Sequence, residues 1–166
     1  MKKQIFATFF IIIIPFLVSS CVSSLFKAKP PTFSQEILLT EPHSPFTRTK
    51  TSVFPSWKNS STGNVIAIVS DCSENSSYNK LSNLNQLIES PLEEVTLIHE
   101  TPITLYNKPA ILRTIHAKLD GQPIEVLSAV FKKKSCGYVA TLSGKLNNLV
   151  ADEKEFKKFI KGFGFK

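Results

Sequence analysis

The chain has 166 residues, which suits a single domain and is enough to bury one hydrophobic core without the help of disulfides. Its 20 Lys and Arg against 13 Asp and Glu give a formal net charge of +7, which indicates a solvated basic surface; attraction to anionic headgroups or polyanions is the alternative. With six glycines, it lacks the glycine loop with which P-loop proteins cradle phosphate.

The first twenty residues have the features of an export signal. Lys2 and Lys3 form a positive start, and residues 5–18 are almost entirely apolar. A membrane-spanning helix needs about 20 apolar residues, whereas this run has 14. A removable signal peptide over residues 1–20 therefore fits better than a permanent transmembrane anchor.

The sequence LVSSC at residues 17–21 resembles the lipobox of bacterial lipoproteins. Ser19 and Ser20 are small enough for a peptidase to close on the backbone, and the thiolate of Cys21 can take a diacylglyceryl group. The resemblance implies that Cys21 becomes the first residue of the mature chain and carries diacylglycerol, usually with an N-acyl chain such as palmitate. The alternative is an ordinary signal peptide with a chance cysteine.

This resemblance also implies a location. One acyl chain binds a membrane with an association constant of only about 10⁴ M⁻¹, so two or three chains make a lasting anchor. Val22 follows Cys21, in place of the aspartate typical of inner-membrane retention. We expect an exported protein, anchored to the cell envelope by lipid, with the outer membrane facing the periplasm favoured in a Gram-negative organism.

The cysteine count is odd, which needs an explanation in an exported protein. The chain has Cys21, Cys72 and Cys136, and lipid on Cys21 leaves the other two as the one possible pair. An exported compartment permits a disulfide. A Cys72–Cys136 disulfide and two separate buried thiols both fit the sequence.

The mature chain divides into a tether and one globular domain. Prolines recur between residues 22 and 45, at positions 30, 31, 42 and 45, and discourage helix and sheet. Residues 21–45 are thus expected to form a lipidated tether, in which the apolar run 37–39 either docks on the domain or begins a strand. Residues 46–166 are expected to form the single domain.

The domain is expected to be α+β. Strand-like patterns cover residues 46–53, 65–69, 95–98, 103–106, 110–119, 124–131 and 136–142, so the C-terminal half is an antiparallel meander. Asp120-Gly121 predicts a tight type I′ hairpin turn. Leucines at helical spacing predict a helix over residues 78–89 that stops at Pro91.

A second helix is expected to start at Asp152. Asp152 and Glu155 have the spacing of a capping box, and an apolar stripe and a lysine face follow: Phe156, Phe159, Ile160, Phe163; Lys154, Lys157, Lys158, Lys161. The stripe is expected to pack on the sheet. The lysine face and the turn at residues 132–134 are expected to be solvated, with anionic headgroups as the alternative contact.

The order of these elements resembles the Mog1/PsbP-like fold, an α/β/α sandwich. The resemblance rests on ITLYNKPA at residues 103–110, GYVATL at residues 137–142 and the phenylalanines of the terminal helix. Asn107-Lys108 replace the family's usual glycine near the turn. The resemblance implies proteins that bind or help assemble other proteins, and it implies no single activity.

The sequence offers no catalytic set. His43, His99 and His116 lack metal-ligand spacing, Glu93-Glu94 adjoin a turn, and Cys72 and Cys136 do not form a CxxC motif. Basic residues without interleaved aromatics argue against nucleic acid. We expect no enzyme, cofactor or metal, and a non-enzymatic envelope module with a protein partner; the alternative is a small-ligand carrier or sensor with a pocket lined by Trp57 or Tyr138.

Overall fold

The computed structural model describes residues 33–50, 52–72 and 80–166. Pro31–Lys166 is one compact unit, and all described residues belong to it. The expected signal peptide, Cys21 and residues 22–32 of the expected tether lie outside the described residues.

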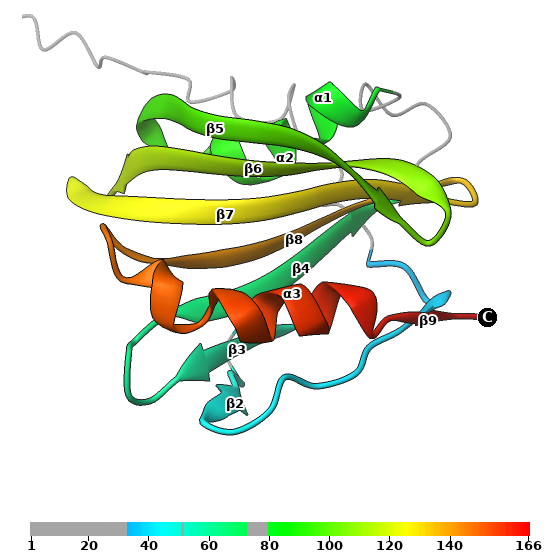
Figure 1. Cartoon of the computed structure of the whole chain (residues 1–166), viewed down its shortest axis with the longest axis horizontal. Coiled ribbons are helices and arrows are strands. Elements are labelled where there is room, and N and C mark those ends of the chain that lie inside the picture. Colours follow the sequence, from blue (N-terminus) through cyan, green and yellow to red (C-terminus); the bar gives the residue numbers. More distant parts are fainter. Residues whose placement is uncertain (1–32, 51, 73–79) are drawn as a thin grey trace, which may run out of the picture. The chain divides into compact units, whose positions relative to one another are not determined.

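Seven antiparallel strands form the main sheet, in the order β2-β3-β4-β8-β7-β6-β5 (Figure 1). Two meanders, β2 to β4 and β5 to β8, meet where β4 pairs with β8. The strands are β2 Phe46–Arg48, β3 Ser56–Asn59, β4 Val65–Asp71, β5 Glu93–Leu105, β6 Lys108–Leu119, β7 Gln122–Lys133 and β8 Cys136–Lys145. The predicted C-terminal meander is confirmed.

Tight turns join the strands of the second meander. Asp120 and Gly121 have φ values of 50° and 72°, as the predicted type I′ turn requires. Tyr106 and Asn107, at 54° and 59°, make the same kind of turn between β5 and β6 without glycine. Asn tolerates this left-handed region better than most residues because its short polar side chain bonds locally.

The strand segments expected at residues 95–98 and 103–106 belong to one strand. The second segment was expected either to continue or to follow the first after Pro102, and β5 runs unbroken from Glu93 to Leu105. Pro102 is tolerated because β5 is an edge strand, where a missing N–H donor leaves no partner unpaired. The strand instead bends at two register shifts, between Glu93 and Thr96 and between Leu97 and His99.

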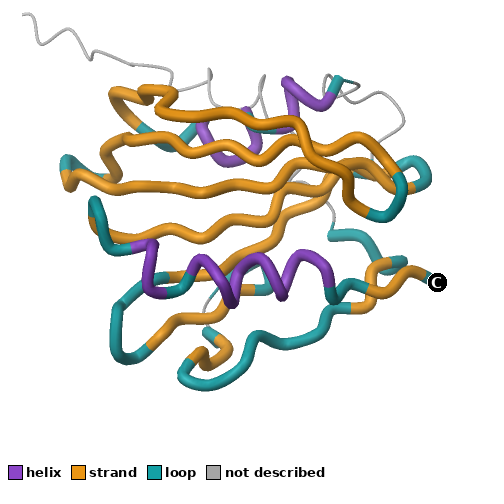
Figure 2. The backbone as a smooth tube through the Cα atoms, in the orientation of Figure 1, coloured by secondary structure: helices purple, strands orange, loops and turns teal. Residues whose placement is uncertain are grey.

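Helices cover both faces of the sheet (Figures 1 and 2). Successive residues of β8 point to opposite faces: Tyr138 belongs to one hydrophobic cluster with α3, Glu153–Lys161, and Val139 to another with Leu84 of α1, Leu81–Leu84. The α+β class, an antiparallel sheet covered by helices, is therefore confirmed.

The terminal helix packs as its stripe predicted. Phe156, Phe159, Ile160 and Phe163 are at most 5% exposed. Trp57 of β3 is 1% exposed and meets Phe159 edge to face, with ring centroids 5.2 Å apart. A short 3-10 helix, η1 Leu149–Ala151, leads into α3.

The helix predicted over residues 78–89 is two short helices. They are α1 and α2, Gln86–Glu89, separated at Asn85, while residues 73–79 lie outside the described part of the chain. The predicted leucine spacing does mark their buried side, where Leu84 is 1% exposed. Leu84 sits directly over Gly137 of β8, where an added Cβ would lie 2.3 Å from its Cδ2 atom.

The compact unit begins earlier than expected. The predicted tether extended to residue 45, but β1, Ile37–Leu38, pairs with β9, Gly164–Phe165. Phe33 and Leu39 also pack against the main hydrophobic cluster. A two-residue strand is too short to show a periodic pattern, so the prolines around it led to the prediction of a tether. The run at residues 37–39 thus docks as a strand, and the boundary lies before Phe33.

Candidate functional site

A disulfide joins the two meanders at one end of the sheet. Cys72 follows β4, Cys136 begins β8, and the neighbouring residues Asp71 and Gly137 are register partners. The structure therefore contains the bond that the cysteine count allowed. Both strands are central, so the bond holds the sheet where its halves meet.

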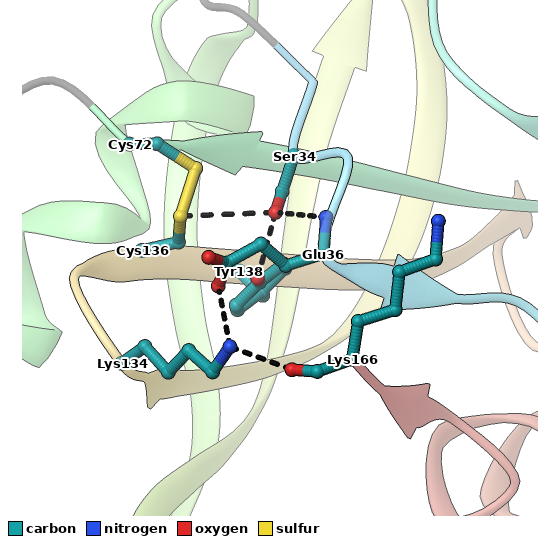
Figure 3. A network of polar contacts seen from close by, with 7 residues as sticks. All are labelled: Ser34, Glu36, Cys72, Lys134, Cys136, Tyr138 and Lys166. Atoms are coloured by element: carbon teal, nitrogen blue, oxygen red, sulfur yellow. Dashed lines mark hydrogen bonds and ion pairs between the residues drawn. A yellow bond between two sulfur atoms is a disulfide. The ribbon is translucent and has the colours of Figure 1, made fainter.

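Ser34 connects this end to the start of the compact unit (Figure 3). Its backbone N–H donates to Ser70 Oγ at 2.7 Å, and its own Oγ accepts a hydrogen bond from the Tyr138 hydroxyl at 3.0 Å. The Cys136 sulfur lies 3.7 Å from the same Oγ. Because a disulfide sulfur carries no proton, it can only accept there. Ser34 is 4% exposed, so these bonds are shielded from water.

The lysine turn between β7 and β8 is tied to both ends of the unit (Figure 3). Lys134 Nζ donates to the main-chain oxygen of Lys166 at 2.6 Å and lies 3.5 Å from Glu36. The Lys166 N–H donates to the Glu36 carbonyl at 2.9 Å. Lys133 lies over the Phe165 ring at 5.5 Å. This turn therefore holds the β1–β9 pair to the sheet.

Two tyrosines, the buried Tyr138 and the partly buried Tyr106, remain protonated at neutral pH. Burial raises the pKa of Tyr106 to about 12, although the Phe163 N–H donating to its oxygen acts in the opposite direction. Burial also raises the pKa of Tyr138, against the Ser34 hydrogen bond, and the Glu36 charge adds to the rise. A phenol with a raised pKa is a poor general base near pH 7, so both hydroxyls serve as structural links.

Asp152 is the centre of a buried polar cluster. Its carboxylate accepts hydrogen bonds from Asn59 Nδ2 at 2.8 Å, Thr62 Oγ1 at 2.6 Å and Asn64 Nδ2 at 2.8 Å. The predicted capping box is wrong: Asp152 occupies the N-cap position, but its side chain makes no cap bond. The carboxylate bonds instead to side chains at the β3–β4 turn, and so it ties that turn to α3.

The Glu155 side chain likewise makes its hydrogen bonds to a residue outside α3. It accepts from the His43 backbone N–H at 2.8 Å and lies 2.6 Å from His43 Nδ1. Burial alone raises the pKa of Glu155, but the two His43 hydrogen bonds and the charges of His43 and Lys158 outweigh it, so the pKa is lowered. The bond fastens the segment before β2 to the terminal helix.

The side chains proposed to line a ligand pocket are core residues. Trp57 and Tyr138 are each at most 1% exposed. The hollows described on the surface are lined by other side chains, such as Lys154 and Lys161 on α3 or Arg48 and Phe54 near β2. Trp57 and Tyr138 therefore do not line any of these hollows.

The remaining candidates are dispersed. His99 lies 2.6 Å from Thr101 Oγ1, and His116 Nε2 lies 3.9 Å from Glu125. In residues 33–50, 52–72 and 80–166, no group of three or more His, Cys, Asp or Glu could hold a metal. None of the helices in the same ranges is long and apolar enough to cross a membrane.

On α3, Lys157 and Lys158 pair with Glu153 and Glu155.

The edge strand β5 carries an exposed surface. All of its first eight residues are exposed, and three of them are large and apolar: Val95, Leu97 and Ile98, at 37, 49 and 50% exposure. Sequence reasoning missed this surface because strand order decides which strand is an edge. The alternation of a half-buried strand gives no sign of whether a neighbour pairs with it.

Comparison with known proteins identifies no family. No protein-family model and no curated protein matches the chain. Its structure is similar to PA94 of Pseudomonas aeruginosa, a protein of unknown function, with TM-score 0.49 and 14% identity over 80% of this chain and 85% of that one. It is similar to cyanobacterial PsbP of Synechocystis sp. PCC 6803, with TM-score 0.48 and 8% identity over 81% and 84%.

A third similar structure is LpqN of Mycobacterium tuberculosis, which is involved in cell envelope biogenesis. The TM-score is 0.38 and the identity 10%, over 82% of each chain. A PsbP protein is thus among the structures that this chain resembles.

Proposed function

We propose that this protein is an exported lipoprotein, anchored to the cell envelope through acylated Cys21, and that its compact unit is a non-enzymatic module that binds an envelope protein. The observation that carries the binding role is the exposed edge of β5, with its three apolar side chains. Large apolar residues gathered on an exposed strand are typical of an interaction surface.

The anchoring role is supported by the cysteines. The Cys72–Cys136 bond leaves Cys21 as the one cysteine of the chain that this disulfide does not use. Disulfides persist in oxidising compartments, and Cys21 directly follows the small residues Ser19 and Ser20. Lipid on Cys21 would leave no reactive thiol in the mature chain.

The non-enzymatic role is supported by what the buried polar groups do. Asp152 bonds to three side chains of the β3–β4 turn, and Tyr138 and Ser34 bond to each other. Each therefore stabilises the fold with its polar atoms. Catalytic acids and bases instead face a cleft with a pKa matched to their task.

Intact-mass measurement of the protein isolated from envelopes tests the anchor. We expect a chain that begins at Cys21, with the added mass of a diacylglyceryl group and a further acyl chain, and a gain of about 2 Da on reduction of the disulfide. A Cys21→Ala variant should stay unprocessed. A mature chain that begins elsewhere, or that lacks acyl mass, would refute the anchoring role.

Cross-linking in intact envelopes, followed by detergent extraction and mass spectrometry, tests the binding role. We expect one protein to be recovered in a fixed ratio with the lipoprotein. A matched lipoprotein with an unrelated domain behind the same residues 1–32 controls for contacts made by the anchor alone. Repeated recovery of this chain with no cross-linked species would contradict the proposal.

A further inference from the structure

We propose that the free edge of β5 pairs with β5 of a second copy of the chain, which joins the two sheets into one antiparallel sheet across a two-fold axis. The inference rests on the proposed role as an interaction module and names the partner. Antiparallel pairing of identical strands is the isologous contact that two-fold symmetry allows, and it repeats the pairing already present between β5 and β6.

The stretch of this edge that is free to pair spans Val95 to Thr101, exposed up to Glu100, and it contains the register shift between Leu97 and His99. Among residues 33–50, 52–72 and 80–166, β5 pairs with β6 on one side only, so outward-facing N–H and C=O groups of this stretch have no described strand beside them in the sheet. Pro102 lacks a donor and closes the stretch at its far end. Val95, Leu97 and Ile98 lie within it, so a second strand would cover apolar surface as well as backbone.

The charges beside this edge do not oppose a second copy. Glu94 lies 2.7 Å from Lys118 Nζ, and Glu100 lies 3.8 Å from Arg113 Nε, both cations belonging to β6. Arg113 is also 3.2 Å from Glu89 of α2. Two β5 edges therefore meet with Glu94 compensated and Glu100 partly compensated, because Glu100 shares Arg113 with Glu89. Uncompensated like charges directly opposite would destabilise the pair.

The opposite edge of the sheet makes the assembly close at two copies. β2 has only three residues, Phe46–Arg48, and directly follows Pro45. Short strands and prolines protect an edge from pairing. A β5–β2 contact would repeat without end, but a β5–β5 contact uses the long edge of both copies. The structure thus favours a dimer over a filament.

The contact is small, so the dimer should be weak in dilute solution. A pair of seven-residue stretches buries less than the roughly 1,200 Å² at the lower end of standard specific interfaces. Confinement of both copies to one membrane would raise their effective concentration and favour pairing. The experiment therefore belongs in the envelope, where the chain is proposed to be anchored.

The test uses two full-length copies with different C-terminal epitope tags, produced together and cross-linked with formaldehyde in intact envelopes. We expect a species of twice the chain mass that carries both tags. The double substitution Leu97→Lys and Ile98→Lys in both copies places like charges across the pair and should lower its yield by about tenfold or more. The control is Val150→Lys on η1, where valine is 78% exposed; it should match the wild type.

Thermal midpoint and disulfide content show whether the double variant folds; if it does not, Val95→Lys alone serves as the edge variant. The absence of a two-tag species, or an equal yield from edge variant and wild type, would overturn the second-copy proposal. If the edge variant instead loses a heavier species with one tag and another protein, the interaction-module proposal stands and the second copy does not. If neither kind of cross-linked species is recovered, both the second-copy proposal and the interaction-module proposal are overturned.

Discussion

At the scale of single residues, the buried polar groups of this chain connect segments that lie far apart in the sequence. Asp152 bonds to Asn59, 93 residues away, and Tyr138 bonds to Ser34, 104 residues away. A buried hydrogen bond to a charged group stabilises a fold by about 1.5–3 kcal/mol. These residues are therefore expected to matter for stability more than for chemistry.

Replacing Asp152 by asparagine tests the buried cluster. The Asp152→Asn side chain has the same shape but one acceptor oxygen fewer, and its new N–H group faces the donors of Thr62 and Asn64. Because a buried donor is left without an acceptor, we expect a loss of about 3 kcal/mol in the free energy of unfolding. Urea denaturation measures it. Asp120→Asn, at the exposed turn, is the control and should change stability little; equal losses would show that burial is not the cause.

The raised pKa of Tyr106 predicts a loss of folding stability at high pH. Its pKa is about 12 in the folded chain against 10.0 for an ordinary tyrosine. The folded state thus keeps the proton that the unfolded state loses, so the stabilisation is complete below pH 10 and disappears as the pH rises toward 12.

Urea midpoints between pH 8 and 12 measure this loss, and absorbance of the phenolate follows the titration itself. The Tyr106→Phe variant should be less stable at neutral pH, since Tyr106 accepts from the Phe163 N–H and donates to the Ile160 carbonyl. Its stability should also fall less steeply above pH 10. A slope identical to that of the wild type would exclude Tyr106 as the group responsible.

At the scale of elements, the disulfide fixes the contact between β4 and β8, through which the two meanders join. The bonded cysteines are 64 residues apart in sequence. For a loop of that length, the chain-entropy relation gives a stabilisation of about 4 kcal/mol, with 2–4 kcal/mol typical of measured disulfides.

The double variant Cys72→Ala and Cys136→Ala is expected to lose about 2–4 kcal/mol in the free energy of unfolding. Wild-type protein in excess reductant should behave like this variant, and the variant itself should be insensitive to reductant. Guanidinium denaturation of both proteins, with and without reductant, makes the comparison. An unchanged midpoint for the reduced wild type would mean that the strand pairing holds the sheet without the bond.

The long elements were predictable and the short ones were not. Strands β6 to β8 and the Phe156–Phe163 stripe of α3 show clear periodicity, and Asp120-Gly121 marks a turn by its chemistry. β1 and β9 have two residues each, too few for any period. The carboxylate of Asp152 makes no cap hydrogen bond and bonds to donors at a turn that is distant in sequence. No local sequence pattern indicates such a partner. The edge position of β5 likewise depends on the strand order of the whole sheet.

At the scale of the whole molecule, the two ends of the described chain meet. β1 pairs with β9, and Lys134 bonds to both Glu36 and Lys166 beside the disulfide (Figure 3). Residues 33–38 thus belong to the folded unit, although they follow directly on the segment that we propose as a tether. Stability should therefore respond very differently to deletions on the two sides of this boundary.

Deleting residues 23–30 should leave the free energy of unfolding unchanged, because a tether contributes reach and no packing. Deleting residues 33–38 instead removes buried Ile37 and the Ser34 hydrogen bonds. Burial of one isoleucine stabilises by about 1.5–3 kcal/mol and each hydrogen bond by about 1 kcal/mol, so a loss above about 3 kcal/mol is expected. Urea denaturation of both deletions in the full-length background measures the difference. If the first deletion is as costly as the second, the tether extends over fewer residues than proposed and the folded unit begins before Pro31.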